Sequence, residues 1–551
     1  MKEWIKSGTP WIWSTAGGLA VALVMVFGVL WMTAARGLPY FWPSQVVETA
    51  FIEKDGSKIR LIGEIREREE VAVRRLVESG FTIPGNEKFT TRYLLKSGNR
   101  DVAGFDFKWY PAPLLSKFTY PDNVLTVERR EWGNFYGHLK SVKENGVVVA
   151  NGDFALPELQ KRVERARKLF DEIFRIEKQE IGDVNFELEK LRLKERKLQL
   201  AGKLDEAANQ SIQNQRLETN GRFAEIQSRL DKLRAEIGRD TLSAEVMDGK
   251  VVDVPLSKVS EVYRANSLNI GDKIGFYFRK LYAFGTEDPR EANTEGGIFP
   301  AIFGTVMLVI MMSILVMPLG VIAAVYMREY AGHGMFIRVI RIAVNNLAGV
   351  PSIVYGVFGL GFFVYSLGGT IDQLFFSEAL PAPTFGSPGI LWSSLTLAIL
   401  TLPVVIVSTE EGLARVPRSL REGSLALGAT KAETLWRTVL PMASPAMMTG
   451  LILAIARAAG ETAPLMLVGV VKLAPSLPLD GHFPYFHLER QFMHLGFHIY
   501  DVGFQSPNIE AARPLVYATA FLLVLVIVVL NLAAVSLRNK LRENYRVLEG
   551  I

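Results

Sequence analysis

The chain of 551 residues contains no cysteine. This absence excludes disulfide bonds, cysteine-ligated zinc, iron–sulfur clusters and thiol nucleophiles. The sequence also lacks a G-x-x-x-x-G-K-[ST] phosphate loop, so any ATP hydrolysis that serves this protein must come from another chain. No pairing of a nucleophile with a base stands out. We therefore expect a protein that is not an enzyme and that carries no cofactor.

Histidine is also scarce, with six residues in all. Four of them fall between positions 482 and 498, and His494 and His498 have the i, i+4 spacing that can bind a metal on a helix. No carboxylate completes a known metal motif, and aromatic residues are interleaved with the histidines. The segment therefore favours an amphipathic helix at the outer membrane interface, and we expect no metal site.

Long apolar runs, in contrast, occur six times, each long enough to cross a bilayer. They cover roughly residues 17–35, 298–327, 342–367, 390–408, 445–471 and 514–537. The sequence therefore predicts an all-α polytopic membrane protein with six transmembrane helices. The first run is interpreted as an uncleaved signal anchor, because no small-x-small cleavage site follows its long apolar core.

Positive charge is distributed unequally among the loops. Five Lys and Arg residues lie in segment 410–441, whereas the loop between the third and fourth runs contains none. By the positive-inside rule, segment 410–441 and both termini are predicted to be cytoplasmic. The predicted parts are a signal anchor over 1–36, a periplasmic insert over 37–297, a five-helix core over 298–540 and a cytoplasmic tail over 541–551.

The insert contains two kinds of sequence pattern. Short alternating runs at 57–63, 123–129 and 146–153 predict strands of a mixed β domain. Between residues 157 and 237 the pattern becomes a charged helix with apolar residues at heptad spacing. This predicts a coiled-coil helical hairpin inserted into an extracytoplasmic α+β domain, with its turn at Gly182-Asp183, at Gly202 or at Asn220-Gly221. The basic residues alternate with glutamates, so the pattern indicates a solvated face and not a nucleic-acid site.

The polar segment 410–441 interrupts the apolar runs. Pro417 is a plausible first residue of a short helix, and Gly428 permits a turn that a larger residue would strain. A second helix is predicted over 431–439, ending before Leu440 and Pro441. Small residues around the turn would let another backbone approach closely. The segment is therefore predicted to be a rigid helix–turn–helix that transmits motion from a cytoplasmic partner.

This segment resembles the coupling motif of binding-protein-dependent ABC importer permeases. That family pattern is Glu-Ala-Ala, three residues, Gly, nine residues, Ile-x-Leu-Pro. The matching residues here are Glu422, Gly423, Ser424, Gly428, Leu440 and Pro441. Gly423 and Ser424 replace the two alanines, and Thr438 replaces the isoleucine. The resemblance implies that the segment sits in a cleft of a separate ATPase subunit.

Three further stretches are similar to the phosphate-specific permeases of that family. They are GGIFPAIFGT (296–305), GVPSIVYGVFGL (349–360) and ARAAGETAPLMLVG (456–469), and the likeness extends over about 296–540. The resemblance implies an ABC importer permease fold in the lipid bilayer. It also implies a homologous permease subunit, ABC ATPase subunits and a periplasmic phosphate-binding protein as partners.

Two charged residues fall inside the fifth apolar run. Arg457 and Glu461 have i, i+4 spacing, which would place them on one helix face. Charges at that depth are costly and usually face the bundle interior or an aqueous path. We expect Arg457, Glu461 and Thr462 to line the path of an anion, since a guanidinium matches phosphate oxygens. The alternative is a self-satisfied pair that only helps helices pack.

Two other functions stay open at this point. The chain could be a permease for another oxyanion or solute, and only the resemblance around Arg457 argues against it. It could also be an envelope sensor or scaffold that uses the external coiled coil. The coupling segment favours a transporter, because a pure sensor does not need an ATPase-docking surface.

Overall fold

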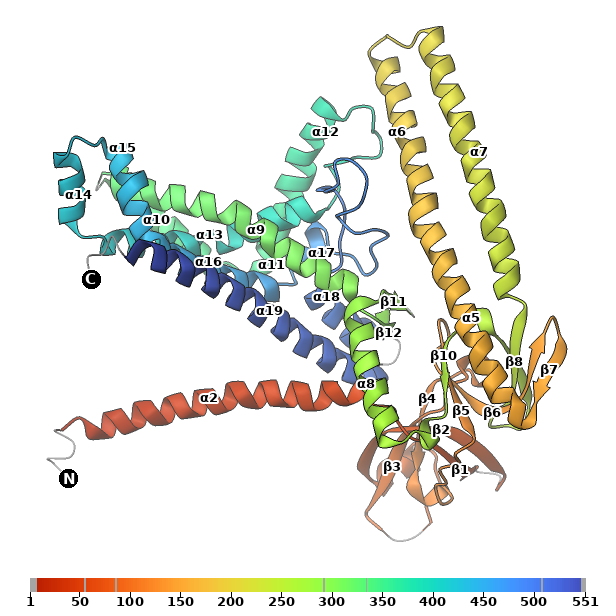
Figure 1. Ribbon diagram of the computed structural model, residues 1–551. Helices are drawn as coiled ribbons and strands as arrows, with labels where there is room; N and C mark the ends of the chain where they lie inside the picture. The colour runs from red at the N-terminus through yellow and green to blue at the C-terminus, as the bar shows by residue number, and fades with distance from the viewer. Residues whose placement is uncertain are drawn as a thin grey trace. The chain divides into compact units, whose positions relative to one another are not determined.

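The computed structural model describes residues 7–53, 56–84, 87–290, 293–332, 334–506 and 509–546. Contacts between residues divide the chain into two units. The membrane unit comprises Met1–Tyr40 with Ile298–Ile551, and the α+β unit comprises Phe41–Gly297. Figure 1 shows the elements of both.

The membrane unit contains six helices that are long and apolar enough to cross a bilayer, counted over the described residues, as the sequence predicts. They are α2 (Thr9–Gly37), α9 (Phe299–Val325) with its extension η8 (Tyr326–Tyr330), α11 (Ser352–Phe358) with η9 (Gly359–Gly368) and α12 (Gly369–Phe375), α13 (Ile390–Arg415), α15 (Lys431–Thr434) with η10 (Leu435–Val439) and α16 (Leu440–Gly460), and α19 (Ile509–Arg546). Shorter helices are α10 (Met335–Leu347), α14 (Arg418–Ala426), α17 (Leu465–Val468) and α18 (Leu495–Tyr500).

Two of the predicted spans have the wrong limits. The third begins at Ser352 and not at residue 342, because the chain leaves the helical conformation before Pro351. The preceding residues form the separate amphipathic helix α10. The fifth span ends at Gly460 and not at residue 471. Pro464 lacks a backbone N–H and restricts the residue before it, which opposes continuation of the helix.

The centre of the membrane unit is a packed cluster on α9, α13 and α16. Its buried residues include Met312 and Val316 from α9, Leu397 from α13 and Ala454 from α16. Small side chains on α16 let the helices approach closely, which is how helices associate in lipid. Phe492, from the segment before α18, is buried in the same cluster.

The described residues of the α+β unit form two antiparallel sheets in addition to a short ribbon. One sheet has the order β1-β2-β3-β4, and the other has β10-β5-β6-β8-β9 with β7 paired to β6. The strands are β1 (Val46–Ile52), β2 (Lys58–Ala72), β3 (Phe89–Lys96), β4 (Phe107–Pro111), β5 (Val124–Arg129), β6 (Phe135–Glu144), β7 (Val147–Asn151), β8 (Asp240–Glu245), β9 (Val251–Pro255) and β10 (Val259–Tyr263). The ribbon is β11 (Pro289–Arg290) with β12 (Glu295–Gly296), and the short helices are α3 (Val73–Glu78), α4 (Arg100–Ala103) and α8 (Ile270–Thr286). The three strands predicted from sequence correspond to β2, β5 and β7.

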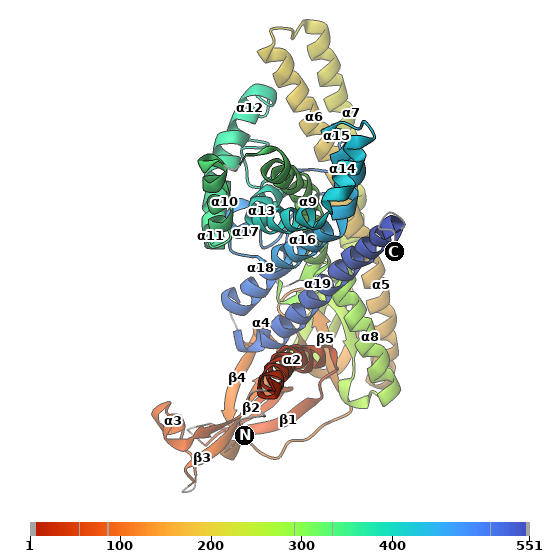
Figure 2. The same cartoon turned by 90° about the vertical axis from the view of Figure 1, so that its left-hand side faces the viewer.

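A long helical hairpin is inserted between β7 and β8. One arm is continuous through α5 (Ala155–Arg175), η4 (Ile176–Glu180) and α6 (Ile181–Leu200), and the other arm is α7 (Glu206–Ile237). Figure 2 shows α6 and α7 side by side. The chain turns around Gly202, which has φ +65°. Of the three predicted turn sites, Gly182-Asp183 and Asn220-Gly221 instead lie inside helices.

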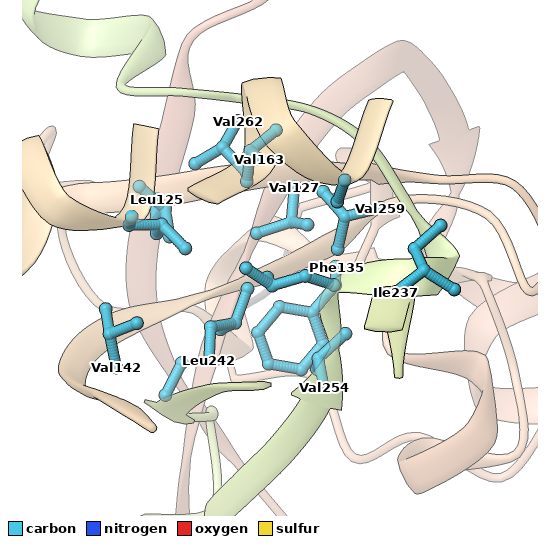
Figure 3. Packing of buried hydrophobic residues seen from close by; sticks show 14 of the residues in the cluster. Leu125, Val127, Phe135, Val142, Val163, Ile237, Leu242, Val254, Val259 and Val262 are labelled. Atoms are coloured by element: carbon cyan, nitrogen blue, oxygen red, sulfur yellow. The ribbon is translucent and has the colours of Figure 1, made fainter. Parts of the chain in front are cut away.

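The base of the hairpin packs on the larger sheet. The heptad residues Leu159, Val163 and Leu230 are buried against the strand residues Phe135 and Leu242. Figure 3 shows this packing around Phe135 and Leu242. The apolar stripes that suggested a coiled coil therefore also cover one face of a sheet. The apolar stripe of a helix and the apolar face of a sheet must each be buried against another element, and here they bury each other.

A row of ion pairs runs along the two arms, from the level of the base outward. Four ion pairs connect them: Glu177–Arg234, Glu180–Arg229, Glu187–Arg222 and Glu195–Arg216. Every glutamate lies on the first arm and every arginine on α7. In each pair the residue number rises along the first arm as it falls along α7, so that the sum of the two residue numbers stays nearly constant. The four pairs therefore share one antiparallel register. Farther out than Ile176 and Leu230, which belong to the core at the base, Val184 and Ile212 are the fully buried apolar residues.

Removing a core side chain at the base of the hairpin is expected to destabilise the α+β unit. Leu159→Ala deletes a side chain with no exposed surface, which typically costs about 2–5 kcal/mol. The measurement is urea-dependent proteolysis of the full chain in detergent. Leu217→Ala, on an exposed position of α7, is the control and should change stability by less than about 0.5 kcal/mol. Equal proteolysis of the two variants would contradict this packing.

Candidate functional site

The coupling segment, residues 410–441, folds into two helices joined by a tight turn. Helix α13 ends at Arg415, Pro417 precedes the first residue of α14, and α15 begins at Lys431. Proline at this position agrees with the predicted helix start. Figure 2 shows α14 and α15 adjacent to each other at one end of the membrane unit.

Backbone hydrogen bonds stop α14 at a defined place. Ala429 N–H donates to the Ser424 carbonyl (3.2 Å) and Gly428 N–H donates to the Leu425 carbonyl (3.0 Å). This is the Schellman pattern, which requires a left-handed residue after the helix. Gly428 supplies it with φ +88°. The predicted role of Gly428 as the turn residue is confirmed.

The chain restarts as a helix two residues later. Thr430 caps α15, and its side chain and that of Glu433 form a reciprocal capping box. The hydroxyl groups of Ser424 and Thr434 are 2.9 Å apart and connect the two helices directly. The residues that end α14 and those that begin α15 are therefore adjacent in sequence, with no flexible residue between them, which makes the turn rigid.

The same turn exposes apolar side chains. Leu427 is 91% exposed and Trp436 is 74% exposed, while Leu425 is about half exposed. Glu422 and Gly423 are also exposed, and a Cβ at Gly423 would meet no atom within 4 Å. The other side of the segment is packed, since Val416, Leu435 and Val439 are buried. The segment thus has one face fixed to the bundle and one apolar face open.

Leu440 and Pro441 do not follow the end of a helix, which corrects the prediction. The helix is continuous from Lys431 to Gly460. Proline removes one backbone hydrogen bond and its ring would clash with the carbonyl four residues earlier. The π-helical turn η10 lies immediately before and provides the wider spacing that admits the ring. The tip of the coupling segment is therefore part of the same helix as Arg457.

Glu329 is a residue of this region that the sequence reading missed. Its carboxylate accepts a hydrogen bond from Arg421 Nη1 at 2.6 Å, and its backbone carbonyl accepts one from Lys431 Nζ. Glu329 lies at the end of α9, 92 residues before Arg421. The available signal was weak: Glu329 is the single acid among the arginines between the second and third spans.

Arg457 lies in the last turn of α16, and Glu461 follows the end of that helix. Their charged groups approach to 3.6 Å, and both side chains are partly exposed. Glu461 has an extended backbone, so the pair is formed across the helix end and not along one helix face as predicted. The negative end of the helix dipole favours a cation at this position.

Arg457 points away from the packed sides of α16. Ala454 and Ala458 face α9 and α13, while Ile455 and Ala459 face α19. Leu453, one turn before Arg457, is more than half exposed. Helical periodicity therefore places Arg457 on a third face of α16, which this chain covers only in part, since 34% of the Arg457 side chain is exposed.

Thr462 is next to α18. A Cβ added at Gly496 would overlap the Thr462 hydroxyl, so the two segments are in direct contact. His494 and His498 are buried in α18 and its cap, and the ring atoms His494 Nε2 and His498 Nδ1 and Nε2 have no hydrogen-bond partner among the described residues. Burial lowers the pKa of each of these histidines to about 4.

Comparison with known proteins identifies the family of this helix bundle. The profile of the family described as "Binding-protein-dependent transport system inner membrane component" matches residues 316–543. A relative from Mycobacterium tuberculosis (strain CDC 1551 / Oshkosh), "Phosphate transport system permease protein PstA 1", is 37% identical over 244 residues, which are 44% of this chain and 71% of the relative. The chain belongs to the binding-protein-dependent transport system inner membrane component family.

Other similarities are less complete. "Phosphate transport system permease protein PstA" of Mycobacterium leprae is 40% identical over 199 residues, and this match spans 35% of the present chain and 60% of the relative. Among solved structures, the inward-facing MetNI methionine ABC transporter matches 44% of this chain and 93% of its own, with 17% identity and a TM-score of 0.31.

Family membership makes the chain a multi-pass inner membrane component and a non-catalytic subunit. The matched region contains Glu329, the coupling segment, Arg457, Glu461 and Thr462. The α+β unit lies outside it. Every candidate residue of the site therefore belongs to the family's transport component, and none belongs to the insert.

Acid is expected to loosen the packing of α18 against the bundle. Both histidines have a pKa below the ordinary 6.5 when packed, so the packed state is favoured above pH 6.5 and loses stability as pH falls toward 4. The loss is about 1.4 kcal/mol per pH unit for each histidine. Because the chain has no cysteine, Leu495→Cys can report opening by thiol labelling.

Leu495 has no exposed surface, whereas Tyr500 at the end of α18 is partly exposed. Tyr500→Cys therefore provides the reference rate that corrects for thiol ionisation. The ratio of the two labelling rates should rise by about a hundredfold or more between pH 7 and pH 5, since both histidines add to the effect. A ratio that does not change with pH would show that the buried histidines do not limit this packing.

Proposed function

We propose that this chain is the permease subunit of an ATP-driven phosphate importer. It forms half of the path for inorganic phosphate across the inner membrane, with a homologous permease subunit forming the other half. The observation that carries the transporter part of the proposal is the coupling segment, which is rigid, anchored on one side and apolar on the other. A surface of that kind is suited to a protein partner and not to water.

The partner that best fits the coupling segment is an ABC ATPase subunit. Leu425, Leu427 and Trp436 present a small apolar patch, and the exposed Glu422 adds one charge at its border. Because α15 and α16 are continuous, displacement of the tip moves the helix that carries Arg457. Docking at the tip can therefore change the environment of the pathway residues without any flexible link.

Phosphate is supported by the chemistry of Arg457 together with the names of the relatives. The two Mycobacterium relatives are named phosphate transport system permeases. An unpaired anion in an apolar region has a large desolvation cost, which a fixed guanidinium offsets. The 3.6 Å approach of Glu461 is too long for a tight hydrogen bond, so it orients Arg457 while leaving its donors available.

The sidedness follows from the charges of the loops. In this proposal the coupling segment and both termini are cytoplasmic, and residues 37–297 are periplasmic. The Arg457 face of α16, which this chain covers only in part, is turned toward the homologous permease subunit across the path. A periplasmic phosphate-binding protein delivers the anion from the outer side.

Arg457→Ala is expected to reduce phosphate uptake by about tenfold or more, because a charge-assisted hydrogen bond contributes about 1.5–3 kcal/mol. The measurement is uptake of radiolabelled phosphate in cells that contain normal amounts of the assembled complex. Leu453→Ala, on the same open face one turn earlier, is the control and should retain uptake. Unchanged uptake in the Arg457 variant would remove this residue from the path.

The same assay tests the substrate. Excess unlabelled phosphate should abolish uptake of the label, whereas sulfate and molybdate at equal concentration should not. Equal competition by sulfate would overturn the assignment of phosphate while leaving the permease assignment in place.

Gly428→Val is expected to weaken ATPase binding by about tenfold. A β-branched residue at φ +88° is strained by about 1–2 kcal/mol, which tilts the two helices that present Leu427. Co-purification of the ATPase with the permease measures the effect.

Gly202→Val is the matched control, since Gly202 also has positive φ but lies in the turn of the α+β hairpin. It should leave ATPase binding unchanged. Normal co-purification and normal ATP turnover in the Gly428 variant would rule out this turn as the docking element.

A further inference from the structure

Three parts of the membrane unit converge on Arg421. Its Nη1 donates to the Glu329 carboxylate at the end of α9, at 2.6 Å, and its Nη2 donates to the Leu413 carbonyl in the last turn of α13, also at 2.6 Å. Arg421 itself belongs to α14. One guanidinium thus joins the first helix of the coupling segment to two membrane helices.

A second cation binds the same end of α9. Lys431, the first residue of α15, donates to the backbone carbonyl of Glu329 and lies over the Tyr330 ring, 4.6 Å from its centre. Lys431 and Arg421 come from the two helices that flank the Gly428 turn. The carboxylate of Glu329 is nearly buried, which protects its bond to Arg421 from solvent screening. We name this arrangement of Glu329, Arg421 and Lys431 the clasp.

The clasp gives α9 its polar connection to the coupling segment. Helix α16 is joined to the segment covalently, because α15 and α16 are continuous. Helix α9 has no such covalent tie. Val416, the first residue after α13, comes 87 positions after Glu329 in the sequence. Apolar contacts of Val325 with the cluster around Leu413 add to the link, but such contacts permit sliding. Directional hydrogen bonds to a charged group resist it.

At its other end, α9 holds α18. The Thr305 hydroxyl accepts a hydrogen bond from Leu495 N–H at 2.9 Å. Thr305 and Glu329 are 24 residues apart, roughly 36 Å along a helix. The next residue of α18, Gly496, is in contact with Thr462. Helix α9 therefore extends from the coupling segment to the segment beside the candidate path.

We propose that the clasp makes α9 move together with the coupling segment, so that ATPase movement on one side reaches α18 beside the path on the other. Glu329 is a positioning residue in this scheme: it contacts neither ATP nor the transported anion. The inference rests on the proposed function, because it needs an ATPase that docks on the coupling segment. The clasp adds a second route to the covalent one. The covalent route runs through α16 and ends at Arg457, and the second route runs through α9 and α18 and ends at Thr462.

The test uses the complete complex in lipid nanodiscs. Since the chain has no cysteine, spin labels can be placed at Ser419→Cys, an exposed position of α14 outside the apolar patch, and at Tyr500→Cys in α18. Addition of ATP should change the distance between the labels in the wild-type background. Glu329→Gln, which keeps the shape but removes the charge, should reduce that change by half or more. It should also lower phosphate transported per ATP hydrolysed at least about fivefold, with ATPase co-purification unchanged.

Two further variants make the result specific. Glu411→Gln removes the acid of an exposed pair with Arg415 in the same region and should have no effect. Exchange of the partners, Glu329→Arg with Arg421→Glu, should restore coupling in part, which a merely structural defect would not do. An undiminished distance change and transport ratio in Glu329→Gln would overturn the clasp. Failure of the wild-type chain to bind an ATPase would instead contradict the proposed function, and the clasp with it.

Discussion

The arrangement of the membrane unit depends on a backbone turn that only a residue without a Cβ adopts at little cost. Gly428 ends α14 in the left-handed region, and the capping box at Thr430 begins the next helix two residues later. From there one helix continues through a π turn and a proline to Gly460. A local conformational preference thereby fixes the direction in which the continuous helix of α15 and α16 leaves the turn.

Three charged residues of the membrane unit are tied to helix ends. Arg457 sits at the negative end of α16, and Glu329 terminates the extension of α9. Arg421 donates to a free carbonyl in the last turn of α13 as well as to Glu329. Helix termini carry the unsatisfied backbone groups of a membrane protein, so they are the places where polar side chains are stabilised without a separate buried network.

Hydropathy and short motifs were sufficient for the number of spans, the turn at Gly428 and the family. They failed where the chain breaks inside an apolar run, since a hydropathy window averages over Pro351 and Pro464 and extends the span beyond the real helix. Heptad spacing identified the hairpin but not the sheet beneath Leu159, because both partners satisfy the same apolar stripe. Contacts such as Glu329 with Arg421 join residues far apart in sequence, and a single sequence carries no local signal for them.

The hairpin of the α+β unit is stabilised by two different interactions along its length. Its base is held by apolar packing on the sheet, which salt does not screen. Its outer part is held by the row of glutamates facing the row of arginines, all of them partly exposed. Exposed pairs of this kind weaken as the Debye length shortens. The contribution of the ion pairs to the stiffness of the arms therefore falls as the ionic strength of the surroundings rises, whereas the packing of Val184 and Ile212 keeps its strength.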